Sequence, residues 1–303
     1  MANITAKDVS ALRERTGVGM MDCKKALVEA EGDFEKAIVI LREKGLATQA
    51  KKAGRVAAEG LVVSMVEGNV GVVVEVNSET DFVANTDQFK NLVNTIAKTI
   101  IACNPADVEA LKACKSVDSD RTIDEEVQEV FLQIRENIQI RRFTRLEGTL
   151  VSYVHGEGRI GVMVQLDTDL GDKAALCGKD VALQIAAMNP AYLDRTCVPA
   201  EVLDNEKNIM LAQMKEDPKM ANKPEAVMAK IVEGKVGKYY SENCLVDMEF
   251  VKDGDYTVGK YVDKCAKDLG GSIKIASYVR YERGEGIEKR SDDFAAEVAS
   301  MMK

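Results

Sequence analysis

The N-terminal part of the chain has hydrophobic residues at helical spacing, which predicts three short helices. The first begins at Thr5 in a sequence that resembles a capping box, and the second and third are expected to end at Gly32 and Gly45. The apolar positions of the second and third helices are Cys23, Ala26, Leu27 and Ala30, then Phe34, Ala37, Ile38 and Leu41. Residues 47–58 are basic and lack large apolar side chains, so we expect a linker or an exposed helix there. Residues 1–55 are therefore predicted to form a small helical domain with its linker.

Beyond this domain the pattern of hydrophobic residues repeats. Two strands joined by a glycine-containing turn are predicted at 59–76, and the same pattern recurs at 147–166. A helix stopped by the dipeptide Asn-Pro follows in both copies, at 95–105 and at 180–190. The chain thus contains two related structural units in tandem.

The repeat continues with a second helix and a last strand, at 123–145 in the first copy and at 258–280 in the second. Each copy reads as strand, strand, helix, helix, strand, with the first two strands antiparallel. The sequence therefore predicts an α+β fold with two repeated ββααβ core subdomains. The first core subdomain is predicted at 56–145, and the second at 146–190 and 258–283.

The second copy carries an insertion at 191–257, where the first copy has only the 17 residues of 106–122. Two periodic apolar runs separated by the breaker DPKMANKP predict an inserted helical hairpin of the coiled-coil type. Such a protrusion either mediates association, including dimerisation, or acts as a stabilising flap. Because the first copy closes without it, we expect the insertion to be dispensable for the core fold.

The first copy has five residues that the second lacks, and they lie between Val76 and Leu92. This interval holds the sequence SETDFVAN, which is therefore extra to the repeated fold. Two interpretations of Phe82 follow. It is either the first apolar residue of the helix through Leu92, capped by Thr80 and buried, or an exposed residue that acts on a partner. Asp81 beside it would be costly to bury unpaired.

The C-terminal residues 284–303 are predicted to form a helical module after the last strand. Phe294, Val298 and Met301 fall on one face of that helix. A short helix with a single apolar face needs a surface on which to dock.

Composition narrows the function further. The net charge of −9 argues against a protein that binds nucleic acid through its phosphate backbone. The seven cysteines are scattered without the close pairs of a structural zinc site, which fits reduced thiols and a cytoplasmic location. No signal-peptide core is present, and no segment approaches the roughly 20 apolar residues that span a bilayer, so no membrane partner is expected.

Residues for covalent catalysis are not evident. The single histidine, His155, falls in a predicted turn and is more typical of a surface residue than of a catalytic base. No phosphate-binding loop motif occurs, and acidic pairs such as Asp167 and Asp169 are typical of solvated surface. No catalytic residue, cofactor or metal site is therefore expected. Met20 and Met21, predicted between the first two helices, either pack inside the helical domain or contact a partner.

Four separated segments resemble the bacterial translation elongation factor Ts family. They are LRERTGVGMMDCKKAL at 12–27, the strand with TDFVAN at 72–85, ENIQIRR at 136–142 and DFAAEVA at 293–299. The resemblance covers essentially the whole chain. It implies an N-terminal three-helix ubiquitin-associated-like domain, two core subdomains with antiparallel sheets, an inserted coiled-coil hairpin and a C-terminal helical module.

The resemblance also implies a function. Factors of this family release GDP from elongation factor Tu, binding its GDP-bound and nucleotide-free forms without covalent chemistry or a cofactor. Asp81 and Phe82 are implied to insert beside the switch region of the GTPase domain and to displace its Mg²⁺-binding and phosphate-binding elements. Thr80 and Val83 flank them in the same contact. A nucleotide-handling enzyme with an unrecognised site is the alternative, and turnover of nucleotide by the purified chain would distinguish it.

Further contacts with Tu are implied outside this segment. They involve Arg13, Met20 and Met21 in the N-terminal domain, His155 on the second copy, and Phe294 and Val298 in the tail helix. One departure from the family pattern is Arg135, which precedes ENIQIRR where relatives carry glycine. The contact that the family pattern implies at this position is therefore not assigned to Arg135.

Overall fold

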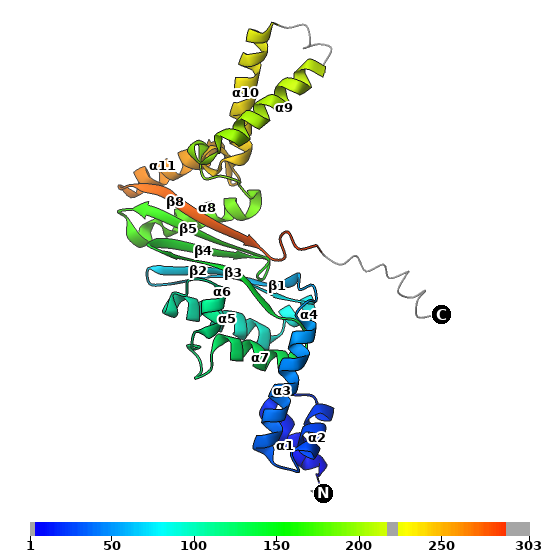
Figure 1. Cartoon of the computed structure of the whole chain (residues 1–303). Coiled ribbons are helices and arrows are strands. Elements are labelled where there is room, and N and C mark those ends of the chain that lie inside the picture. Colours follow the sequence, from blue (N-terminus) through cyan, green and yellow to red (C-terminus); the bar gives the residue numbers. More distant parts are fainter. Residues whose placement is uncertain (1–3, 217–223, 289–303) are drawn as a thin grey trace.

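The computed structural model describes residues 4–216 and 224–288. Two three-stranded antiparallel sheets lie next to each other in the middle of the molecule, and helices cover the outer face of each (Figure 1). The N-terminal helices extend from one end of this sandwich and a helical hairpin extends from the other. The α+β fold class is confirmed.

The N-terminal domain consists of three helices around one small core. These helices are α1 (Ala6–Thr16), α2 (Met20–Glu29) and α3 (Phe34–Lys52). Thr5 forms the predicted capping box at α1. The expectation that Gly45 ends the third helix is wrong, because α3 runs on for another seven residues to Lys52. Gly45 lies at a helix contact instead, since a Cβ atom there would be 2.1 Å from Cδ2 of Leu132.

The first core module is a sheet in the order β1-β2-β3 with helices on its outer face. The strands are β1 (Glu59–Glu67), β2 (Val70–Ser78) and β3 (Gln139–Glu147). The helices are α4 (Asp81–Ala84), α5 (Asp87–Cys103), α6 (Val108–Ala113) and α7 (Ile123–Ile134). Phe89 and Ile96 of α5 are fully buried against the valines of β2.

The second core module has the corresponding order β4-β5-β8. Its strands are β4 (Thr149–His155), β5 (Ile160–Thr168) and β8 (Ile273–Glu282). The covering helices are α8 (Ala175–Met188) and α11 (Val258–Leu269), with a short 3₁₀ turn η1 (Gly171–Ala174) before α8.

The two modules match in their irregularities as well as in their regular parts. The last strand of each sheet has a bulge at the same place, at Arg141 of β3 opposite Glu75 and Val76, and at Ala276 of β8 opposite Gln165 and Leu166. Helices α5 and α8 both end at an asparagine in the left-handed conformation, Asn104 with φ 47° and Asn189 with φ 46°. Matched bulges and caps indicate that the sequence repeat is a structural repeat.

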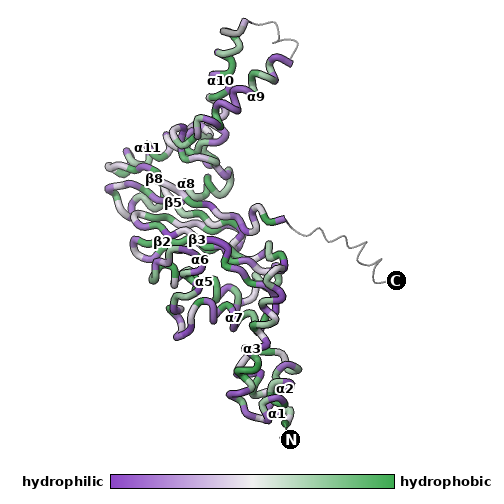
Figure 2. Tube along the Cα trace, in the orientation of Figure 1, coloured by the Kyte–Doolittle hydropathy of each residue, from purple (hydrophilic) through white to green (hydrophobic). Residues whose placement is uncertain are grey.

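Facing surfaces of the two sheets form a core of their own. Val62, Val73 and Met163 are fully buried there, and Leu150 and Tyr281 pack around them. Figure 2 shows hydrophobic residues along the strands of both sheets. Full burial of a side chain of this size stabilises the fold by about 1.5–3 kcal/mol, so this contact fixes the two modules against each other.

The insertion contains more than the predicted hairpin. Helices α9 (Ala200–Glu216) and α10 (Glu225–Asn243) pack through Met214, Met228, Val232 and Val236. They are flanked by the 3₁₀ turns η2 (Arg195–Cys197) and η3 (Leu245–Asp247). A two-stranded sheet then follows, β6 (Glu249–Phe250) with β7 (Asp253–Thr257), which corrects the purely helical expectation.

Contacts with α8 explain this small sheet. The buried Gln184 side chain donates to the carbonyl oxygen of Glu249 and accepts from the amide of Val251. Phe250 is buried in the core of the second module. A hairpin of such short strands is stabilised by these tertiary contacts and not by its local sequence.

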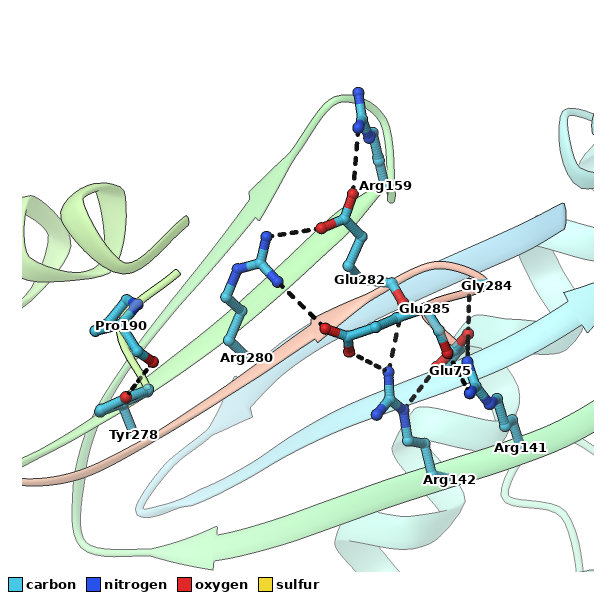
Figure 3. A network of polar contacts seen from close by, with 10 residues as sticks. All are labelled: Glu75, Arg141, Arg142, Arg159, Pro190, Tyr278, Arg280, Glu282, Gly284 and Glu285. Carbon is cyan, nitrogen blue, oxygen red and sulfur yellow. Dashed lines mark hydrogen bonds and ion pairs between the residues drawn. The ribbon is translucent and has the colours of Figure 1, made fainter. Parts of the chain in front are cut away.

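A buried carboxylate ties the first sheet to the residues that follow β8 (Figure 3). Glu75 is fully buried and accepts hydrogen bonds from Nε of Arg142 at 2.7 Å and Nη1 of Arg141 at 3.0 Å. The backbone amide of Gly284 donates to the same carboxylate at 2.8 Å. Burial raises the pKa of Glu75, but the hydrogen bonds from Gly284, Asn77 and the two arginines outweigh it, so the pKa lies below its ordinary value.

The network extends from Glu75 to the second module. Arg142 also donates to Glu285 at 3.1 Å, and Arg280 pairs with Glu282 at 2.8 Å. Arg159, in the turn between β4 and β5, completes the chain of charges at Glu282 (Figure 3). The start of the C-terminal segment is therefore fixed between the two modules.

Candidate functional site

A four-residue helix, α4, carries the SETDFVAN sequence at the end of β2. Its second residue, Phe82, is 83% exposed, the most exposed of the large hydrophobic side chains that the structure describes. Val83 and Ala84 on the opposite side are 9% and 1% exposed and belong to the core of the first module. The helix therefore presents an aromatic ring to solvent while its other face is anchored.

Side chains hold α4 at both ends. Thr80 is its N-cap and accepts a hydrogen bond from the Val83 amide at 3.3 Å. At the other end the Asn85 side chain donates to the carbonyl oxygen of Asp81, and the Thr86 hydroxyl donates to that of Val83. A helix of this length is not stable by itself, so these caps and the buried residues give it its shape.

The two interpretations of Phe82 are now distinguished. Helix α5 begins separately at Asp87, with Thr86 as its N-cap, and its first buried aromatic residue is Phe89. Phe82 is thus not the first core position of that helix. The Val83 side chain is buried and supports α4 from below, and its implied contact with a partner stays a prediction.

Residues after α7 connect α4 to the rest of the protein. Glu136 accepts two hydrogen bonds from Thr80, one from its amide at 3.0 Å and one from its hydroxyl at 2.8 Å. The neighbouring Asn137 is buried, and its amide donates to Glu79 at 2.7 Å. The hydrophobic pattern of the sequence predicts no role for Glu136 or Glu79. The signal that would have indicated one is the ENIQIRR motif, which begins with Glu136.

A second exposed apolar feature lies on the N-terminal domain. Met20 and Met21 are 39% and 64% exposed. They form the first turn of α2 and not a loop before it, because Gly19 is the N-cap of that helix. Arg13 is exposed on α1. The core of this domain is made by other residues, so its exposed methionines are available for contact.

Arg135 fixes this domain to the first module. It is the C-cap of α7 with φ 65°, a conformation that favours glycine. Its guanidinium donates to Asp22 of α2 at 2.9 Å, and the Lys52 side chain donates to its carbonyl oxygen. Arg135 therefore bridges the N-terminal domain and the first module.

Comparison with known proteins agrees with this arrangement. The family model described as Elongation factor TS matches residues 79–285, which include α4, β3 and all three strands of the second sheet. The protein named Elongation factor Ts from Syntrophotalea carbinolica is 50% identical over 305 residues, covering 99% of each chain. The chain belongs to the elongation factor Ts family. Proteins of the same name from Clostridium acetobutylicum and Clostridium novyi are each 48% identical over 306 residues, covering 99% of each chain. The chain is accordingly a translation elongation factor of protein biosynthesis.

In this family member His155 lies at the last position of β4, and the turn begins one residue later. Its imidazole Nδ1 is 2.9 Å from the hydroxyl of Tyr153. The two rings border a shallow hollow of about 400 Å³ together with Leu183 and Arg280. His155 is exposed and has a surface hollow beside it, which suits a contact with another protein.

Other expectations concern the tail and bound groups. Phe294 and Val298 lie outside the described residues. Within residues 4–216 and 224–288, no three His, Cys, Asp or Glu side chains are grouped closely enough to hold a metal ion. None of the helices in the same ranges has the length and hydropathy required to cross a membrane.

Proposed function

We propose that this chain is a guanine nucleotide exchange factor that binds elongation factor Tu and promotes release of GDP without covalent chemistry. The observation that supports this most directly is Phe82, an aromatic ring 83% exposed on a helix that is capped and anchored. Exposing such a ring is unfavourable for an isolated protein. A ring held in this way is suited to insert into another protein.

In this mechanism Phe82 enters between elements of the GTPase domain of Tu and replaces part of their packing. Asp81, exposed beside it, competes for hydrogen bonds and repels the phosphate and metal ligands. The Mg²⁺-binding and phosphate-binding elements of Tu are displaced as a result. By linkage, the factor lowers GDP affinity only as far as GDP lowers the affinity of Tu for the factor, so it binds nucleotide-free Tu more tightly than GDP-bound Tu.

Phe82→Ala tests this proposal. Release of labelled GDP from Tu should slow about 30-fold at saturating factor, as expected for loss of about 2 kcal/mol at an interface anchor. Thermal stability should change by less than about 0.5 kcal/mol, because the ring is exposed. The matched control is Leu176→Ala, at another exposed hydrophobic residue, 72% exposed, on α8 of the second module. Parental exchange by Phe82→Ala, or a complex of Tu that excess GDP fails to dissociate, would contradict the mechanism.

Additional contacts hold the partner in place. Arg13, Met20 and Met21 are proposed to grip a second face of the GTPase domain, and His155 is proposed to contact Tu from the second module. Phe294 and Val298 of the tail are proposed to contact it as well. The fixed position of Gly284 in the Glu75 network sets where that tail begins.

The hairpin of α9 and α10 is proposed to serve association, including dimerisation. Its helices bury Met214, Met228, Val232 and Val236 between them, so the hairpin keeps its shape away from the sheets. Ile209 and Val227 remain exposed on it at 42% and 41%. Sedimentation of the chain with and without the hairpin tests this role.

A further inference from the structure

The residues that hold α4 differ from those that hold the corresponding part of the second module. After the second strand of each module, an acidic side chain accepts a hydrogen bond from the amide that precedes the last strand. Glu79 binds the amide of Asn137 at 2.7 Å, and Asp169 binds the amide of Ser272 at 2.7 Å. This contact occurs in both modules, so it belongs to the shared scaffold.

The Glu136 contact occurs in the first module alone. In the repeat, Thr80 of the first copy corresponds to Leu170 of the second, and Glu136 corresponds to Gly271. Neither Leu170 nor Gly271 has a side chain that could form such a pair. The carboxylate of Glu136 therefore appears together with the extra segment that carries Phe82, and the scaffold does not require it.

Hydrogen-bond directions show what this carboxylate does. Both the amide and the hydroxyl of Thr80 donate to Glu136, at 3.0 and 2.8 Å. Because the hydroxyl proton is used in that bond, the oxygen has its lone pairs free for the Val83 amide, from which it accepts at 3.3 Å. Glu136 thus orients the cap of a helix that is too short to hold itself.

From these contacts we infer that Glu136 is a positioning residue for the exchange reaction. It fixes Thr80, and through Thr80 it fixes the direction in which α4 presents Phe82. The inference rests on the proposed function of Phe82. Glu136 itself is only partly exposed and has its two carboxylate oxygens occupied by Thr80, so it acts through α4 and not by touching the partner.

Glu136→Gln tests this role, since glutamine keeps the size of the side chain but offers one acceptor oxygen instead of two. In the full chain without partner, hydrogen exchange at the amides of Thr80 and Val83 should become faster. With Tu, the saturating rate of GDP release should fall about tenfold, while the factor concentration for half-maximal rate stays within about twofold, as expected when binding persists and the reacting geometry is lost. Thr80→Val removes both the hydroxyl bond to Glu136 and the cap of the Val83 amide, so it should slow release by itself, and Glu136→Gln should slow release less in that variant than in the parent.

Glu129→Gln is the matched control. Glu129 lies on α7, seven residues before Glu136, and pairs with Arg121 at 3.7 Å. It should leave both the amide exchange and the GDP release unchanged. The inference is overturned if Glu136→Gln behaves like this control. It is also overturned if Glu136→Gln slows release while the Thr80 and Val83 amides keep their protection, because Glu136 would then act on the partner directly. Parental exchange by Phe82→Ala would instead refute the proposed function.

Discussion

The buried carboxylate of Glu75 allows a quantitative test of how the first module is held together. Glu75→Gln keeps the shape of the side chain and removes its charge. The wild-type carboxylate accepts from Arg141, Arg142 and Gly284 at 2.7–3.0 Å with no exposure to solvent. Breaking a buried ion pair by removing one partner costs about 3–5 kcal/mol.

The cost here should lie at or below the low end of that range. Arg141 and Arg142 are 26% and 31% exposed, so their guanidinium groups regain part of their hydration when the charge is lost. Glutamine also keeps one acceptor oxygen. We therefore expect Glu75→Gln to lower the free energy of unfolding by about 2–3 kcal/mol, or the Tm by roughly 5–10 °C.

The second module supplies the control. At the position of Glu75 it has Gln165, which accepts a hydrogen bond at 2.7 Å from Ser277, the counterpart of Arg142. The double variant Glu75→Gln with Arg142→Ser reproduces this neutral pair. The double variant should be no less stable than either single variant. The two single effects then do not add, and the difference gives a coupling energy between Glu75 and Arg142 of about 2 kcal/mol. Urea unfolding measures all three.

Acid titration tests the same carboxylate independently. The pKa of Glu75 lies below its ordinary value of 4.5 in the folded protein, so the unfolded chain binds the proton first as the pH falls. The stabilisation is therefore complete above pH 4.5 and is lost as the pH falls through the folded pKa. Between neutral pH and the folded pKa, Glu75→Gln should lose less free energy of unfolding than the parent does. A cost below about 1 kcal/mol at neutral pH, or single effects that simply add, would refute the account of this network.

Two further predictions follow from the exposed surfaces. Met20→Ala with Met21→Ala should weaken the complex with Tu by about 1–2 kcal/mol in a binding titration and leave Tm within about 2 °C, whereas a large fall in Tm would show that the pair supports the helical core. Replacing residues 201–242 by a short Gly-Ser linker should leave a chain that unfolds cooperatively and releases GDP from Tu at the parental rate, and loss of cooperative unfolding would contradict the independence of the hairpin core.

The expectation that the whole insertion, residues 191–257, is dispensable needs a correction, which is why the proposed deletion stops at residue 242. Leu245, Met248 and Phe250 belong to the insertion by sequence, yet they are buried in the core of the second module. Comparison of repeat lengths shows how many residues are extra. It does not show which of them have become part of the core.

Much of the fold could be predicted because the two copies can be compared along one chain. Both Asn-Pro helix stops and both strand pairs lie where the repeat places them. Gly45 was misassigned because glycine ends many helices, while here it permits Leu132 to approach α3. That contact joins residues 87 positions apart, and periodicity within one helix contains no information about it.

In the candidate site, too, the features that the repeat reveals could be predicted and the contacts between distant residues could not. The extra segment between Val76 and Leu92 was recognisable from the repeat, and the structure exposes Phe82 within it. The burial of Val83 follows from the way α4 rests on the first sheet, which the sequence alone does not reveal. The contact of Glu136 could not be predicted from local sequence, because its partner Thr80 lies 56 residues earlier in the chain.

The two insertions, for which we propose roles in recognition and in association, lie apart from each other in the fold. Figure 1 places α4 and the N-terminal helices toward one end of the molecule and the hairpin of α9 and α10 at the other, with both sheets between them. The sheets are fixed to each other by buried residues such as Val73 and Met163. If the proposed roles hold, substitutions in α4 should slow exchange and leave the sedimentation of the free chain unchanged, because α4 and the described residues of the hairpin pack in separate cores.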